Sequence, residues 1–168
     1  MDTAWILVCD SAKARFFEAH GADPKWRLHS EVLHEESRSK AADLASDRQG
    51  SRSSEGGSVH HNALAPASSP KEVEKEHFAH LLGQRLDVAL RSARFGCWVL
   101  VAPPHFAGLM LKELTPQLRK HLLATVNKDL GHLDAVALEE RLRQVIRVRR
   151  DEQAAFREPK HQHRGSVR

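Results

Sequence analysis

The chain has few cysteines, few aromatic residues and no long apolar run. Only two cysteines, Cys9 and Cys97, occur in 168 residues, and both stand in apolar segments. Two thiols do not make a zinc cage, so we expect buried free cysteines rather than a disulfide or a metal site. No apolar run approaches the roughly 18 residues that span a membrane. The N-terminus, MDTAWILVCD, has an acid where a signal peptide needs a base, which predicts a cytoplasmic protein that binds no membrane.

The short motifs of several enzyme classes are missing as well. There is no GxSxG elbow, no Walker loop, no GxGxxG and no HExxH in the sequence, so a serine hydrolase, a nucleotide site and a zinc protease lack their usual signatures. The pairs His60-His61 and His77-x-x-His80 are interpreted as solvated histidines, with metal binding as the alternative. We therefore predict no cofactor and no metal, and we lean against an enzyme.

Positive charge is concentrated at the C-terminus. Residues 141–168 hold nine Lys/Arg and three acids, a net charge of +6, so residues 1–140 carry the remaining −2 of the total of +4. A basic tail of this kind holds nucleic acid or another anionic surface electrostatically, or it is only a soluble end. The length of 168 residues suits one domain, which we assign to residues 1–150, followed by a disordered basic tail over 151–168.

The most apolar part of the chain is Cys97–Ala102, CWVLVA, followed by Pro103-Pro104. Because it has no polar position, we expect a strand buried on both faces at the centre of a sheet. The stretch 97–111 is then simply the core strand and its exit loop, with a functional corner at the strand end as the alternative. Upstream, the pattern predicts a hairpin over 4–20 and a half-exposed strand over 26–33, with Trp26, Leu28, Ser30 and Val32 on one face, which together form an antiparallel meander.

Helices and one more strand complete the expected α/β architecture. Ser69-Pro70-Lys71-Glu72 reads as a capping box that starts a helix, with Val73, Phe78, Leu81, Leu82, Val88 and Ala89 on its apolar face. A helix over 105–114, a Thr-capped helix from 115 and a strand over 122–127 follow. Asp134 caps the last helix, whose buried face is Leu138, Leu142, Val145 and Ile146; Phe106 is interpreted as a packed aromatic residue, with a stacking platform as the alternative.

Residues 49–69, QGSRSSEGGSVHHNALAPASS, interrupt this order. Glycine, serine and proline dominate the stretch, and it has no hydrophobic periodicity. Loops of this length inside a domain are usually functional or disordered, so we predict a long flexible loop with a functional role.

Five segments resemble the host attachment protein family of bacteria, whose members are described as required for attachment to host cells. They are WILVCDSAKARFFEA at 5–19, LHEESRSKAADLASDRQG at 33–50, SPKEVEKEHFAHLLGQRL at 69–86, WVLVAPPHFAGLML at 98–111 and NKDLGHL at 127–133. That family is in turn similar to the middle domain of archaeal and eukaryotic peptide-chain release factors. The resemblance implies a mixed α/β sheet of about five strands, an antiparallel meander plus parallel strands with flanking helices, in a ribonuclease-H-like topology.

The resemblance also implies contact with tRNA or ribosomal RNA, in translation or ribosome rescue. In release factors a Gly-Gly-Gln tripeptide in the loop before the long helix helps water to cleave peptidyl-tRNA. Here that loop has Gly56-Gly57-Ser58, with Gln49-Gly50 upstream, so the tripeptide is not intact. The alternatives are a non-catalytic factor that acts indirectly in attachment through a protein partner, and a peptidyl-tRNA hydrolase.

Two groups of residues are candidates for these functions. The candidate functional loop comprises Gln49, Gly50, Arg52, Gly56, Gly57 and Ser58. The candidate RNA-binding residues are Arg38, Lys40, Arg48, Lys112, Lys128, Arg147, Arg149 and Arg150. If the second group shares a face with the basic tail, it would follow an RNA backbone; otherwise it is an ordinary charged surface.

Overall fold

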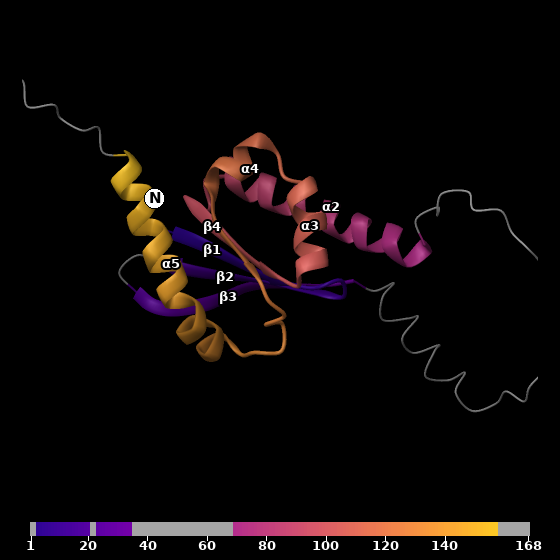
Figure 1. Ribbon diagram of the computed structural model, residues 1–168, viewed down its shortest axis with the longest axis horizontal. Helices are drawn as coiled ribbons and strands as arrows, with labels where there is room; N and C mark the ends of the chain where they lie inside the picture. The colour runs from indigo at the N-terminus through magenta and orange to yellow at the C-terminus, as the bar shows by residue number, and fades with distance from the viewer. Residues whose placement is uncertain (1–2, 21–22, 35–68, 158–168) are drawn as a thin grey trace, which may run out of the picture.

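The computed structural model describes residues 3–20, 23–34 and 69–157, which form a five-stranded sheet with helices on both faces (Figure 1). Side chains are described for all of these except residues 23–24 and 149–157. The strands are β1 (Thr3–Cys9), β2 (Lys13–His20), β3 (Asp23–Leu33), β4 (Cys97–Ala102) and β5 (Leu122–Asn127). The helices are α2 (Pro70–Arg91), α3 (Pro104–Lys112), α4 (Pro116–His121) and α5 (Ala135–Arg157).

The strands lie in the order β3-β2-β1-β4-β5. β2 pairs antiparallel with β1 and with β3, whereas β4 pairs parallel with β1 and with β5. The order confirms the predicted antiparallel meander and the mixed sheet of five strands. β4 is buried along Trp98–Ala102 because helices cover both faces of the sheet at its centre.

Alternate residues of the central strands enter two separate cores. Leu7 and Leu100 point to the face covered by α2, α3 and α4, and their neighbours Ile6 and Val99 point to the face covered by α5. All four side chains are fully buried. Since successive residues of a strand face opposite sides, one continuous apolar run such as CWVLVA supplies both cores.

The face assignment predicted for β3 is wrong. Trp26 packs in the core on the α5 side, whereas Val32 packs in the core on the α2 side. The pairing shows why: Phe16 lies opposite Ser30 and Phe17 lies opposite Leu28, so His29 is an extra residue in β3. A β-bulge of this kind reverses the alternation on one side of it.

Helix α2 begins where the sequence predicts, with a different packed face. Ser69 Oγ accepts the Glu72 N–H at 3.3 Å, and Pro70 takes the first helical position. The buried residues Phe78, Leu82, Leu86 and Ala89 face the sheet, but Val73, Leu81 and Val88 are exposed, Leu81 by 43% and Val88 by 64%. The predicted apolar face therefore mixed two stripes of the helix, one of them open to solvent.

The last helix also differs in length. Asp134 caps α5 by accepting the Ala137 N–H at 2.8 Å, and Leu138, Leu142 and Ile146 are buried as predicted, but Val145 is 38% exposed. α5 continues through residues 151–157, which the sequence assigned to a disordered tail. Residues 151–157, DEQAAFR, are mostly good helix formers, and they extend a helix that packing has already nucleated. Residues 158–168 lie outside the described part.

Both cysteines are free thiols, but only Cys9 is buried; Cys97 is half-buried at the start of β4. Phe106 is buried, as expected for a packed aromatic residue. Among the described residues, no helix combines the length and the apolar character that a membrane crossing requires.

Candidate functional site

One edge of the sheet collects the ends of four strands. β1, β3, β4 and β5 run in the same direction, so Asp10, His34, Pro103 and Lys128, which follow them, lie at that edge. The chain leaves the described part after His34 and returns at Ser69, the start of α2. Open α/β sheets bind ligands at the carboxyl ends of their strands, so this edge holds the corner after β4 that the sequence left open as an alternative functional site.

His34, the last residue before segment 35–68, is held by several contacts. Its backbone N–H donates to the Ala12 carbonyl at 2.8 Å, and its Nδ1 lies 3.0 Å from the Ser11 carbonyl oxygen. Its ring stacks on Phe78 of α2 with centroids 4.7 Å apart and planes within 3°. His34 is the one buried polar residue among residues 3–20, 25–34 and 69–148, and these contacts satisfy it.

A second set of contacts holds the first turn of α2, where the described chain resumes. Glu72 lies 3.2 Å from Lys75 Nζ and 2.5 Å from His105 Nε2, so the first turn of α2 is tied to the first turn of α3. Hydrogen bonding from Lys75, and then from His105, holds the pKa of Glu72 below its usual value. The carboxylate thus pairs with these side chains, while Ser69 caps the helix alone.

Asp10, Arg15 and Cys9, which lie at or near this edge, have structural roles. Asp10 accepts the N–H groups of Ala12 and Lys13 at 2.7 and 2.9 Å, which closes the β1–β2 turn. Arg15 donates to the carbonyls of Gly131 and Leu133 at 2.8 and 2.7 Å and so holds the loop between β5 and α5. Burial raises the pKa of the Cys9 thiol, and Asp10 adds to the effect, so Cys9 is protonated and inert near neutral pH.

In the described part of the chain, no three His, Cys, Asp or Glu side chains come together as a metal site would require. His77 is exposed, and His80 lies 2.7 Å from Glu113 of the α3 C-cap. Both rings of the HxxH pair reach solvent, and His80 is in addition paired with Glu113. The other pair, His60-His61, lies outside the described residues.

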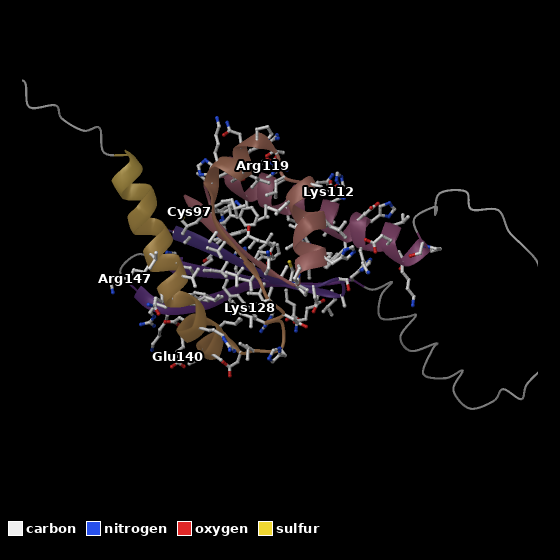
Figure 2. The ribbon with its side chains drawn as sticks, in the orientation of Figure 1. Cys97, Lys112, Arg119, Lys128, Glu140 and Arg147 are labelled. Atoms are coloured by element: carbon white, nitrogen blue, oxygen red, sulfur yellow. The ribbon has the colours of Figure 1, made fainter. Side chains whose placement is uncertain are left out.

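The structure does not bring the described RNA-binding candidates together. Lys112 ends α3, Lys128 follows β5, and Arg147 lies on α5, on the opposite face of the sheet from α3 (Figure 2). The side chains of Arg149 and Arg150 lie outside the described part, although both positions belong to α5. Also outside it are Arg38, Lys40, Arg48, Gln49, Gly50, Arg52, Gly56, Gly57 and Ser58.

Positive charge is instead concentrated on the second half of α5. Residues 141–157 hold six arginines and two acids. Arg141 and Arg147 are exposed, and Arg143 pairs with Glu139. The last buried residue described in this helix is Ile146, and the helix runs past the end of the strands (Figure 1). The sequence already indicated that Arg147, Arg149 and Arg150 end the last helix, but not that this helix continues as far as Arg157.

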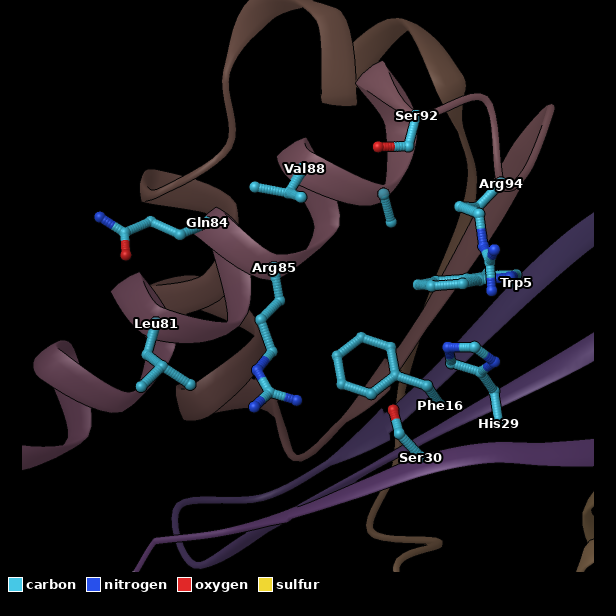
Figure 3. A pocket seen from close by; sticks show the side chains of 11 residues that line it. Trp5, Phe16, His29, Ser30, Leu81, Gln84, Arg85, Val88, Ser92 and Arg94 are labelled. Carbon is cyan, nitrogen blue, oxygen red and sulfur yellow. The ribbon is translucent and has the colours of Figure 1, made fainter.

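A groove that the sequence did not predict lies between α2 and the sheet (Figure 3). It has a volume of about 640 Å³, and strands β1, β2 and β3 supply its floor with Trp5, Phe16, His29 and Ser30. Opposite the floor, α2 and the turn after it form a wall with Leu81, Gln84, Arg85, Val88, Ala89, Ser92 and Arg94. The sequence held one signal for it: Leu81 and Val88 are seven residues apart on a different stripe from Phe78 and Leu82.

Comparison with known proteins gives one family. A family model described as "protein required for attachment to host cells" matches residues 5–142. No protein of curated function matches the chain. Similar solved structures include an archaeal protein, with a TM-score of 0.44 and 13% identity over 92% of this chain and 38% of that one. Another is the archaeal translation termination factor aRF1, with a TM-score of 0.41 and 13% identity over 92% of this chain and 39% of that one. The chain thus spans about two fifths of the length of each.

Proposed function

The chain belongs to the family of proteins required for attachment to host cells, and from that premise we propose that it is a cytosolic RNA-binding module rather than an enzyme. Its partner would be tRNA or the ribosome, and any effect on attachment would be indirect. The observation that supports this proposal is the arginine-rich second half of α5.

A helix is a better support for these charges than a tail. Positions 143, 147 and 150 are spaced by four and three residues, so they lie on one side of α5. Cations held at fixed spacing meet successive phosphates without the ordering cost of a flexible segment, and binding of this kind weakens steeply as salt rises. Lys112 and Lys128 stand elsewhere on the molecule and are not needed for this contact.

The test is sedimentation of the protein with ribosomes from cell lysate at low and high salt. A truncation before residue 141 would also remove Leu142 and Ile146 from the core, so charge substitutions are the cleaner tool. We expect the wild type to co-sediment at low salt only. The variant with Arg143, Arg147 and Arg150 all changed to Gln removes the three cations on that side of α5. It should lose most of that binding, because each lost phosphate contact lowers the affinity and the salt dependence.

The matched control is Lys112→Gln combined with Lys128→Gln, which removes two cations away from α5. It should bind ribosomes as the wild type does. Absence of co-sedimentation at low salt, or equal binding by the α5 variant, would overturn the RNA proposal.

The family description also supports a second candidate, a non-catalytic factor that acts in attachment through a protein partner. Loss of attachment in cells that carry the α5 charge variant, with ribosome binding intact, would favour it. Peptidyl-tRNA hydrolysis stays a prediction of the resemblance: it expects Gly57→Ala to abolish release activity, and a fully active variant would contradict it.

A further inference from the structure

We propose that the groove between α2 and the sheet binds a small amphiphilic anion, an apolar chain or ring that carries one carboxylate or sulfonate. The groove is on the α2 side of the sheet, whereas the α5 arginines are on the other side. The inference is therefore independent of the proposed RNA function, and either one can fail without the other.

Two aromatic side chains of the floor, Trp5 and Phe16, are apolar and held in place by the core. Trp5 is 5% exposed and Phe16 is 1% exposed, with their ring centroids 5.7 Å apart in an edge-to-face arrangement. Phe95 supports Trp5 from within the core at 5.0 Å. Leu81 and Val88 face this floor from α2 (Figure 3). An apolar ligand would bury these two side chains without any rearrangement of the core.

The size of the groove fits a small molecule. Its volume of about 640 Å³ falls within the roughly 300–1,000 Å³ of ligand pockets. The helical wall from Leu81 to Ser92 is about 16 Å long at 1.5 Å per residue. An extended medium-length acyl chain would lie along this wall.

Two arginines determine the sign of the ligand's charge. Arg85, from the middle of the α2 wall, and Arg94, from the turn after α2, reach towards the aromatic floor (Figure 3). Among the described residues, neither guanidinium group has a carboxylate partner, whereas Arg91 on the same helix lies 2.6 Å from Asp87. Guanidinium groups beside apolar surface are well suited to bind a carboxylate or sulfonate.

Acidic groups do not line the groove. Glu18 is close to the floor, but it accepts from Trp5 Nε1 at 3.2 Å and lies 3.0 Å from His29 Nδ1. The described side chains that line the groove comprise two arginines, one histidine and no acid. An anion therefore meets no like charge there, and a cation would have no partner.

The probe is decanoate, titrated into the full-length protein by isothermal calorimetry below its micelle-forming concentration. Decyltrimethylammonium has the same chain and the opposite charge, and it serves as the ligand control. We expect decanoate to bind at one site and the ammonium compound to bind at least about tenfold more weakly, a difference of about 1.4 kcal/mol.

Variants locate the site. Arg85→Gln with Arg94→Gln should weaken decanoate binding by about fivefold to tenfold, because two exposed charge-assisted contacts are lost. Val88→Asp, at an exposed position of the wall, should weaken it as well by placing a negative charge in the groove. Arg91→Gln is the matched control and should bind as the wild type does, and circular dichroism checks that each variant is folded.

Three outcomes would overturn the proposal: no heat with decanoate, equal binding of the two amphiphiles, or unchanged affinity in the Arg85–Arg94 double variant. Weakening by Arg91→Gln equal to that of the double variant would also overturn it, since that result would show nonspecific attraction to the helix surface.

Discussion

At the scale of single residues, His34 joins the end of β3 to the β1–β2 turn and to α2. It contacts the β1–β2 turn through Ser11 and Ala12, and it stacks on Phe78 from α2. Histidine suits the place because it combines a flat ring for stacking with a ring nitrogen that bonds a backbone carbonyl. No sequence pattern singled it out among twelve histidines.

We expect His34→Ala to lower the free energy of unfolding by about 1–3 kcal/mol, because it removes both the buried hydrogen bond and the ring contact. His34→Phe should cost less, since it keeps the stacking and loses only the hydrogen bond. Urea denaturation measures both effects.

His77→Ala is the matched control, because His77 is exposed on the same helix that carries Phe78. It should change the free energy of unfolding by less than about 0.5 kcal/mol. Equal effects of the His34 and His77 substitutions would mean that the His34 contacts contribute nothing to stability.

At the scale of elements, one carboxylate connects the first turns of α2 and α3. Glu72 connects the two N-terminal turns through His105, and hydrogen bonding from Lys75 and His105 lowers its pKa. A carboxyl group whose pKa is lower in the folded state stabilises the fold above its ordinary pKa, which is 4.5 here. That contribution is lost as the pH falls through the lowered value.

The lowered pKa of Glu72 determines how the effect of a Glu72 substitution on stability changes with pH. Near neutral pH, Glu72→Gln should have a lower urea midpoint than the wild type. The difference should shrink as the pH is lowered from about 6 to about 3, because the wild-type carboxyl group then becomes protonated too. Glu76→Gln, at an exposed position of the same helix, should show a smaller difference at every pH, and a Glu72 difference that grows on acidification would contradict the assignment.

Elements also show where periodicity misleads. The bulge at His29 reversed the faces of β3, so the predicted grouping of Trp26 with Val32 was wrong. In α2, helical spacing allowed Leu81 and Val88 to be counted with the buried residues, although α2 does not pack against the strands there and a groove separates them. Periodicity does not reveal a bulge that shifts the alternation of a strand. It also does not show whether another element covers a given face of a helix.

At the scale of the whole molecule, one sheet separates two cores. Phe16 and Phe17 are neighbours in β2, and they point into different cores. Each strand therefore couples the α2–α3–α4 layer to the α5 layer, and loss of packing on one face disturbs the strands that form the other. This arrangement predicts one cooperative unfolding transition for the described part of the chain.

Phe16→Ala and Phe17→Ala test this coupling. Each should lower the free energy of unfolding by about 3–5 kcal/mol, because each side chain is almost fully buried. Denaturation followed by tryptophan fluorescence and by circular dichroism should coincide in both variants. Separate transitions from the two probes would show that the two layers unfold independently.

The sequence by itself determined the kinds of elements, their order and the central place of CWVLVA, because apolar periodicity and helix caps act over a few residues. It also located the excess of arginine after residue 140. Only the tertiary structure decided that α5 carries arginines as far as Arg157, that His34 and Glu72 hold the two ends of segment 35–68, and that α2 leaves a groove over β2 and β3. These features join residues far apart in the chain, so they depend on the register and packing of whole elements, which no local pattern contains.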